Sequence, residues 1–265
     1  RLTDRGASRF YTLSNGFTGS YPSSEELFYL RSILKTLFQN SFFRSMISGL
    51  AGRDIRKGIE IFLDFCKSGH ISEEEIVRMK HNKGDYSIPN HIISKVFMRG
   101  NRVYYSDAET KVKNIFYADI NDELPDPFVR LAILIWLRAR NHIKGPSNLI
   151  GFHRVSSLVA DLTILGHDGG RVTETQNIEM VDLNELVAIN SPGLIHLRLL
   201  QDIDYLGACA EDVWYNQDSV ASKIANRMAG KGPYSHLSLH STLSNADSLV
   251  SFLSEYDDRF YKSPE

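Results

Sequence analysis

The stretch from Gly49 to Phe62, Gly-Leu-Ala-Gly-Arg-Asp-Ile-Arg-Lys-Gly-Ile-Glu-Ile-Phe, decides how the first part of the chain is organised. Gly49 and Gly52 end one short helix, because glycine most readily takes the left-handed conformation found at helix C-termini. Asp54 can then cap the next helix by accepting a hydrogen bond from a backbone N–H of its first turn. The apolar spacing predicts that this helix has a buried face made of Ile55, Ile59, Phe62 and Cys66, with Leu63 beside it.

Helical signatures flank this stretch on both sides. Ser23 with Glu26, and Ser72 with Glu75, have the spacing of a capping box, which predicts that helices start at both serines. The second of these helices covers residues 73–80. After Ser23, apolar residues follow one another at helical spacing, namely Leu27, Leu30, Leu34, Leu37 and Phe38. Residues before this helix are predicted as loop or short strand, and the first 80 residues as a whole as a helical bundle.

The middle of the chain predicts a second module. A helix over residues 90–98 precedes a linker at 120–127, which contains Pro125 and Pro127. The residues that follow the linker, 128–140, are apolar on nearly every side, as in a helix at the centre of a domain. The pattern continues with an amphipathic segment at 152–165, a glycine-rich turn, a third helix at 174–186, a short strand at 186–189 and a long helix from 192 to about 215.

Compact helices with a turn and a strand remnant suggest a helix-turn-helix or winged-helix module. The last segment, 219–262, is predicted as two further helices, one ending near residue 228 and one from 245 to 260. The predicted fold class is therefore mainly α. The predicted domains are a helical bundle at 1–120, a winged-helix-like domain at 121–218 and a helical tail at 219–265.

The sequence around Asp54 resembles the lid subdomain of AAA+ and related signal-transduction (STAND) P-loop ATPases, notably those of the origin-recognition initiator type. In that family a Gly-Asp-x-Arg-Lys-like sequence opens a lid helix, and its arginine, called sensor 2, reaches the terminal phosphates of the nucleotide. Arg56 falls on that position, with Lys57 after it and Arg53 nearby as a second nucleotide-sensing candidate. The resemblance covers residues 23–80, and these ATPases often carry a winged-helix module after the lid.

The resemblance implies that the helical lid belongs to a larger enzyme. Gly58 and Ile59 stand where the family more typically has an Ala-Leu pair, and neither Walker motif is present. ATP and Mg²⁺ are therefore expected only for the complete protein. Independently of the family, an arginine in the first turn of a helix is well placed to meet a phosphate, because free N–H groups and the positive end of the helix dipole lie beside it. The plain alternative is a surface pair of Arg56 with Glu60, four residues later.

Charge is unevenly spread along the chain. Residues 1–150 carry 22 Lys+Arg against 16 Asp+Glu, a net +6, whereas residues 151–265 carry 8 against 16, a net −8. The basic half suits an anion such as a nucleotide or nucleic acid; alternatively, the two halves attract each other or a partner. The candidates for DNA contact are Arg99, Arg102, Lys111, Lys113, Arg154 and Arg171, with His153.

The third helix predicted for the winged-helix-like domain is poorly suited to DNA. Phosphate contacts demand Lys and Arg. The side chains expected to be exposed on this helix are largely acidic, namely Glu174, Gln176, Asn177, Glu179, Asp182 and Glu185. This acidic balance favours a surface that docks a protein partner, and contact with duplex DNA is the alternative.

Signatures of several enzyme classes are missing from the sequence. There is no Gly-x-x-x-x-Gly-Lys-Ser/Thr loop, no Gly-x-Gly-x-x-Gly after a strand and no Gly-x-Ser-x-Gly elbow. Cys66 and Cys209 are isolated in apolar helical patterns, which predicts buried free thiols, no metal site and a reducing, cytoplasmic compartment. No run of 18 or more apolar residues is present, so no membrane span is expected.

Two histidine pairs are weak candidates for chemistry. His236 and His240 would share a helix face, but a zinc site needs a third ligand, and Leu237 stands where a metalloprotease has its glutamate. His167 and Asp168 lie in a glycine-rich sequence, where a turn is the better prediction.

These features predict a regulatory and interaction module of a larger P-loop ATPase, which couples nucleotide state to partner binding or self-assembly. No complete catalytic site is expected within the chain. The alternative is a DNA-binding winged-helix module of a replication, mobile-element or defence ATPase. A third class is an enzyme whose site these patterns do not reveal, for which a strongly shifted carboxylate or histidine pair in a deep pocket would be the sign.

Overall fold

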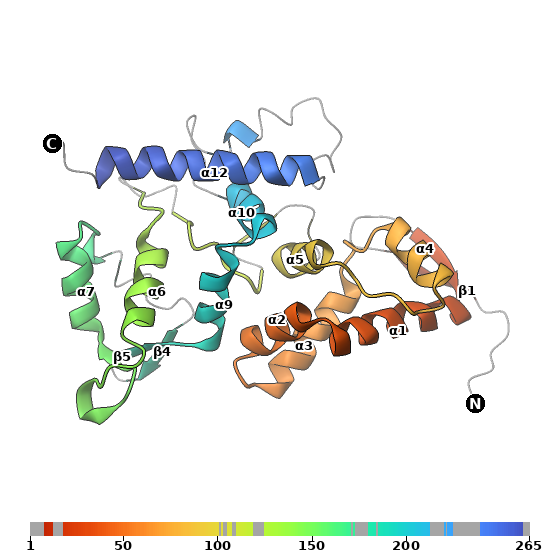
Figure 1. Cartoon of the computed structure of the whole chain (residues 1–265), viewed down its shortest axis with the longest axis horizontal. Coiled ribbons are helices and arrows are strands. Elements are labelled where there is room, and N and C mark those ends of the chain that lie inside the picture. Colours follow the sequence, from red (N-terminus) through yellow and green to blue (C-terminus); the bar gives the residue numbers. More distant parts are fainter. Residues whose placement is uncertain are drawn as a thin grey trace. The chain divides into compact units, whose positions relative to one another are not determined.

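A computed structural model shows a mainly α-helical protein that divides into two compact units, Arg1–Ser106 (unit 1) and Asp107–Glu265 (unit 2) (Figure 1). The sequence had suggested boundaries at 120 and 218. The structure describes residues 8–12, 18–100, 102, 105–107, 110–118, 125–170, 172, 180–183, 185–212, 220, 222–224 and 239–261.

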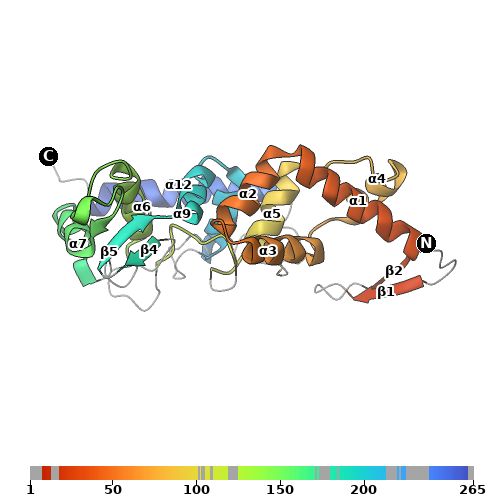
Figure 2. The same ribbon diagram turned by 90° about the horizontal axis from the view of Figure 1, so that it is seen from below.

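Unit 1 begins with a two-stranded antiparallel hairpin of β1 (Ser8–Thr12) and β2 (Thr18–Pro22), in which Ser8 is paired with Pro22. Figure 2 shows this hairpin leading directly into the first helix. The bundle that follows consists of α1 (Ser23–Gln39), α2 (Ser41–Ala51), α3 (Ile55–Lys67), α4 (Glu73–His81) and α5 (Asn90–Arg99). The helices predicted between Ser23 and residue 80 are confirmed.

Three aromatic rings make the centre of unit 1. Phe43 of α2, Phe65 of α3 and Phe97 of α5 are buried. The ring centroids lie 4.4 Å apart for Phe43 and Phe65, and 5.8 and 5.7 Å from Phe97 to each of the others. Tilted aromatic pairs at such distances stabilise a core beyond the effect of buried area alone. The three rings hold α2, α3 and α5 together.

Local capping fixes where the helices of unit 1 begin. The Asp54 carboxylate accepts a hydrogen bond from the backbone N–H of Lys57 at 3.1 Å, and the Ser72 hydroxyl accepts one from the N–H of Glu75 at 3.3 Å, so both predicted caps are confirmed. The carboxylate of Glu75 does not complete a capping box, because it accepts hydrogen bonds from Arg78 and Tyr86 instead. Helix α1 starts at Ser23 as predicted, and the side chains of its first turn lie outside the described part.

Unit 2 contains two helices, α6 (Val129–Ala139) and α7 (Val155–Ile164), that lie beside a small sheet. Helix α6 is followed by a 3₁₀ turn at Pro146–Asn148, strand β3 (His153–Arg154) and helix α7. Strands β4 (Met180–Leu183) and β5 (Leu186–Ile189) form an antiparallel hairpin, and β3 pairs with the other edge of β5, which gives the strand order β3-β5-β4.

Two secondary-structure predictions in unit 2 are wrong. The helix predicted over residues 174–186 is contradicted at 180–183, which form β4; residues 173–179 lie outside the described part. The sequence Met-Val-Asp-Leu pairs with β5, and strand formation depends on such a partner more than on local sequence. The long helix predicted from 192 to about 215 is interrupted after α9 (Ser191–Leu199), because the Asp202 side chain caps a separate helix, α10 (Ile203–Cys209). The short strand predicted at 186–189 is confirmed as β5.

The C-terminal helix belongs to unit 2. A short 3₁₀ turn, η2 (Ala210–Asp212), follows α10, and α12 (Leu239–Phe260) packs across α10. A Cβ atom on Gly207 of α10 would lie 2.8 Å from both the carbonyl oxygen and Cγ2 of Thr242, so the two helices cross at a point that requires glycine. The Tyr256 hydroxyl of α12 donates to the carbonyl of Pro125 at 2.6 Å, which ties α12 to the segment before α6. Among the described residues, no helix is long and apolar enough to span a membrane.

Candidate functional site

The start of α3 presents three basic side chains to solvent. Arg53, Arg56 and Lys57 are exposed. Arg53 has a left-handed backbone (φ 74°) directly after Gly52 (φ 61°), so the chain turns sharply before Asp54 caps the helix. Arg56 makes no ion pair with Glu60 or with any other described residue. The surface pair of Arg56 with Glu60, which was the alternative interpretation, is therefore not formed.

The apolar face predicted to be buried on α3 is mostly exposed. The exposed fractions are 81% for Ile55, 55% for Ile59 and 45% for Leu63, whereas Ile61 and Phe65 are buried. The prediction was wrong because the core of unit 1 contacts a face of α3 rotated away from the Ile55–Ile59 stripe. By helical geometry, with about 100° of rotation for each residue, Arg56 lies on the same outward face as this stripe.

Helix α1 carries a second outward apolar stripe. Leu27, Leu30, Leu34 and Phe38 are 64%, 48%, 45% and 70% exposed. The opposite face of α1 is buried and partly polar: the Thr36 hydroxyl donates to the carbonyl of Ser32 at 2.8 Å and accepts from the N–H of Ile88 at 2.9 Å. A row of exposed apolar side chains is typical of surfaces that other protein segments cover.

Three of the seven predicted DNA-contact residues are buried or half-buried, namely Arg99, His153 and Lys113. Arg99 is buried, so it is poorly placed to contact DNA. His153 is half-buried; its Nε2 donates to the carbonyl of Arg140 at 3.0 Å, and its ring meets Trp136 edge-on with centroids 5.4 Å apart. These contacts make His153 part of the packing between α6 and β3.

The five other predicted basic contacts have different surroundings. Arg102 and Lys111 are exposed, as is Arg154 on β3. Lys113 is half-buried, and its ammonium donates to the carbonyl of Asp107 at 2.6 Å. Arg171 lies outside the described residues.

A basic surface that the predictions overlooked lies between α6 and α7. No Asp or Glu occurs between Asp126 and Asp161, although unit 2 as a whole carries 14 Lys+Arg against 22 Asp+Glu. Within this acid-free stretch the exposed basic side chains are Arg138, His142, Lys144 and Arg154. A count of acidic residues in a sliding window along the sequence would have found it.

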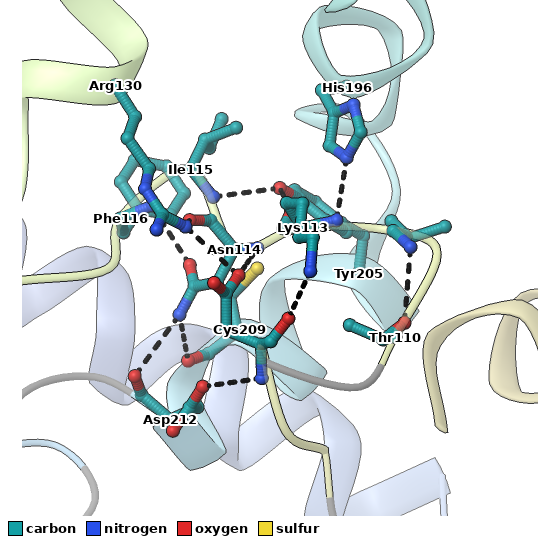
Figure 3. Close-up of polar contacts among 12 residues, drawn as sticks. Thr110, Lys113, Asn114, Ile115, Phe116, Arg130, His196, Tyr205, Cys209 and Asp212 are labelled. Atoms are coloured by element: carbon teal, nitrogen blue, oxygen red, sulfur yellow. Dashed lines mark hydrogen bonds and ion pairs between the residues drawn. The ribbon is translucent and has the colours of Figure 1, made fainter. Parts of the chain in front are cut away.

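Unit 2 also contains a buried polar network centred on Asp107 and Asn114 (Figure 3). Asp107 Oδ1 accepts from Arg130 Nη1 at 3.0 Å and from the backbone N–H of Asn114 at 2.6 Å. The Asn114 side-chain amide donates to the carbonyls of Cys209 at 3.1 Å and Asp212 at 3.3 Å. The network joins the segment before α6 to the end of α10, and the side chains of Arg130 and Asp107 are each 12% exposed.

Two ring side chains extend this network toward α9 and α10. His196 Nε2 accepts from the backbone N–H of Lys113 at 2.7 Å while its Nδ1 donates to the carbonyl of Pro192 at 2.7 Å, so the ring is neutral. Burial lowers the pKa of His196 from 6.5 to about 4. The Tyr205 hydroxyl donates to the carbonyl of Lys113 at 2.8 Å and accepts from the N–H of Ile115 at 3.2 Å. These bonds occupy both ring nitrogens of His196, which leaves no atom of this ring for proton transfer to a substrate.

The remaining candidates for chemistry are held in contacts that stabilise the fold, or are thiols of low reactivity. His167 pairs with Asp126 rather than with Asp168: its Nδ1 lies 2.7 Å from Asp126 Oδ2, and Tyr261 bonds to the same carboxylate. This cluster joins α12 to the segments that flank α6 and α7. Burial raises the pKa of the Cys66 thiol to about 11 and that of Cys209 further, so neither thiol is a ready nucleophile. His236 lies outside the described residues, among which no group of His, Cys, Asp or Glu is placed to hold a metal ion.

Comparison with protein-family models, with curated proteins and with solved structures finds no match for this chain. The candidate site therefore rests on the residues themselves: the exposed basic turn at Arg53–Lys57, the outward apolar faces of α1 and α3, and the basic surface after α6.

Proposed function

We propose that this chain is a regulatory and interaction module of a larger P-loop ATPase, in which a helical lid couples nucleotide state to partner binding or self-assembly. The observation that carries the proposal is the start of α3, where Arg56 is exposed and unpaired among the described residues. Asp54 holds the first turn of α3 in a defined geometry, so the direction in which Arg56 leaves the helix is set by the fold.

Arg56 would act by stabilising negative charge on a bound nucleotide. A guanidinium presents several donors in one plane, which suits the oxygens of a phosphate. The outward face that Arg56 shares with Ile55 and Ile59 would rest against the nucleotide-binding core, so that burial of these aliphatic side chains would bring the arginine to the phosphates. ATP and Mg²⁺ would be bound by the complete protein, with Arg53 as a second contact.

Unit 2 is proposed to be a winged-helix-like module that serves as the docking part. The succession of α6, β3, α7 and the β4–β5 hairpin, with strand order β3-β5-β4, supports this topology. The net charge of −8 in unit 2 favours a protein partner over nucleic acid, since phosphate contacts need basic side chains. The helical tail α12 packs within the same unit.

One observation favours the alternative, a DNA-binding module. Arg138, Lys144 and Arg154 are exposed and belong to a stretch without acidic residues. Titration of the chain into labelled duplex DNA, followed by fluorescence anisotropy, separates the two functions. Binding that weakens steeply with salt would support DNA contact, whereas no binding at low salt would leave unit 2 as a protein-docking surface.

ATP turnover of the complete protein tests the sensor proposal. Arg56→Ala should lower the turnover about tenfold or more, because a charge that stabilises the transferred phosphoryl group is lost. Lys67→Ala is the matched control, since Lys67 is an exposed cation at the other end of the same helix. Equal turnover of wild type and Arg56→Ala would contradict the sensor assignment.

A further inference from the structure

The loop between α6 and β3 is a tightly bonded hairpin. The N–H of Gly145 donates to the carbonyl of Leu149 at 2.9 Å, and the N–H of Gly151 donates to the carbonyl of Ile143 at 2.9 Å. A Cβ atom on Gly145 would lie 1.6 Å from the carbonyl oxygen of Phe152, so the chain closes on itself there. A loop held by its own hydrogen bonds loses little conformational freedom when it docks.

This loop exposes aliphatic and basic side chains together. Ile143, Leu149 and Ile150 are 52%, 42% and 60% exposed. Lys144 lies among them and is exposed, and so is Arg138 at the end of α6. A surface that combines exposed aliphatic groups with positive charge fits a partner surface that combines aliphatic groups with negative charge.

The outward face of α12 has that complementary composition. Leu243 and Val250 are 37% and 53% exposed, and Asp247 and Glu255 are exposed as well. Leu243, Asp247 and Val250 are separated by four and three residues, so they lie in one row along the helix. By helical geometry, with about 100° of rotation for each residue, this row lies roughly opposite the buried side chains of α12, which include Leu249, Phe252 and Tyr256.

The loop and the outward face of α12 lie at opposite ends of unit 2. In Figure 1 the loop extends below α6 and α7, while α12 runs across the other end of the unit. The loop therefore does not reach the α12 face of its own chain. A contact between the two surfaces would have to join two copies of the chain.

We propose that the α6–β3 loop of one copy docks on the outward face of α12 of a second copy. Lys144 would meet Asp247 of that copy while Ile150 covers Val250. Because the two surfaces differ, the contact is head-to-tail and can repeat to form a ring or a filament. Nucleic acid is the less suitable occupant of the loop, since phosphates would leave its three exposed aliphatic side chains uncovered.

Different experiments test this contact and the nucleotide-sensing role, so either proposal can be contradicted while the other stands. The self-association rests on the proposed function only in that unit 2 is taken to be the docking part, and it needs neither Arg56 nor ATP. The Arg56→Ala comparison leaves both surfaces of unit 2 intact, and the variants below leave the start of α3 intact.

Sedimentation velocity of the 265-residue chain over a range of concentrations at low salt tests the contact. Wild type should associate in a concentration-dependent manner. Lys144→Glu or Asp247→Lys should each weaken the association about tenfold, because an attraction becomes a repulsion. The double variant Lys144→Glu/Asp247→Lys should restore it, since the pair is re-formed with opposite polarity.

Two further variants separate the contact from general effects of charge. Lys67→Glu makes the same charge change on unit 1 and should leave the association unchanged. Ile150→Ser removes an exposed side chain without disturbing the core, and should weaken the association even at high salt. A chain that stays monomeric at every concentration, or a double variant that associates no better than the single ones, would overturn the proposal.

Discussion

The start of α3 and the Asp107 network each contain an arginine, but the two arginines have opposite surroundings. Arg56 stands in solvent with no ion-pair partner among the described residues, whereas Arg130 is bound to Asp107 and to the carbonyl of Asn114 in the interior of unit 2. The guanidinium of Arg130 also lies 4.6 Å from the centroid of the Tyr117 ring. A mostly buried, ion-paired arginine serves stability, whereas an exposed, unpaired one remains available for a ligand. This contrast gives Arg56 a proposed role and gives Arg130 none beyond the fold.

The largest expected effect is the loss of Arg130. Arg130→Ala should lower the free energy of unfolding by about 3–5 kcal/mol, because the buried Asp107 carboxylate loses its ion-pair partner. Urea denaturation followed by circular dichroism measures this. Arg56→Ala is the matched variant and should change the stability by less than about 0.5 kcal/mol. Similar losses of unfolding free energy for the two variants would contradict the difference proposed between the two arginines.

Acid should loosen the same network through His196. Its folded-state pKa of about 4 lies below its ordinary value of 6.5, so the folded protein binds the proton less readily than the unfolded chain does. The contribution of His196 is therefore fully present above pH 6.5 and is lost as the pH falls toward 4, by about 3 kcal/mol at most.

The measurement for His196 is the free energy of unfolding across that pH range. His196→Gln should flatten the decline, since Gln does not titrate there. His142→Gln, which changes an exposed histidine, should leave the profile as it is in the wild type. A wild-type profile that does not change between pH 6.5 and 4 would show that proton binding to His196 is not linked to folding.

A smaller effect on stability is expected at the start of α3. Asp54→Ala removes the side chain that accepts the N–H of Lys57, which should cost about 1 kcal/mol of stability. Asp54→Asn keeps an acceptor oxygen and should retain most of the stability. Thermal unfolding of the three proteins checks this order. A loss as large as that of Arg130→Ala would mean that the start of α3 is itself part of the structural core.

Helix starts could be predicted from the sequence, because caps act within a few residues. Ser23, Asp54 and Ser72 each begin a helix at the predicted place or directly before it. The helix expected at 180–183 could not be distinguished from β4, since that strand depends on pairing with β5. Local patterns therefore predicted the mainly α class. The missed strand β4 depends on non-local pairing, whereas the missed break before α10 comes from a local cap at Asp202.

The candidate site was predicted only in part. Arg56 was found from its neighbours in the sequence, but burial depends on what packs against a helix, so the exposed stripe at Ile55 and Ile59 was taken for a core face. The Asp107 network could not be anticipated, because the backbone N–H of Asp107 donates to a carboxylate 105 residues away, on Asp212. Pairings over such separations leave no periodic signal.

Hydrogen exchange of the complete protein, with and without ATP and Mg²⁺, tests the central claim most directly. The backbone amides of residues 55–58, in the first turn of α3, should exchange more slowly when nucleotide is bound, and Arg56→Ala should abolish this protection while Lys67→Ala retains it. Unchanged exchange in that turn, under conditions in which the protein demonstrably binds ATP, would contradict the proposal that this helix senses the nucleotide.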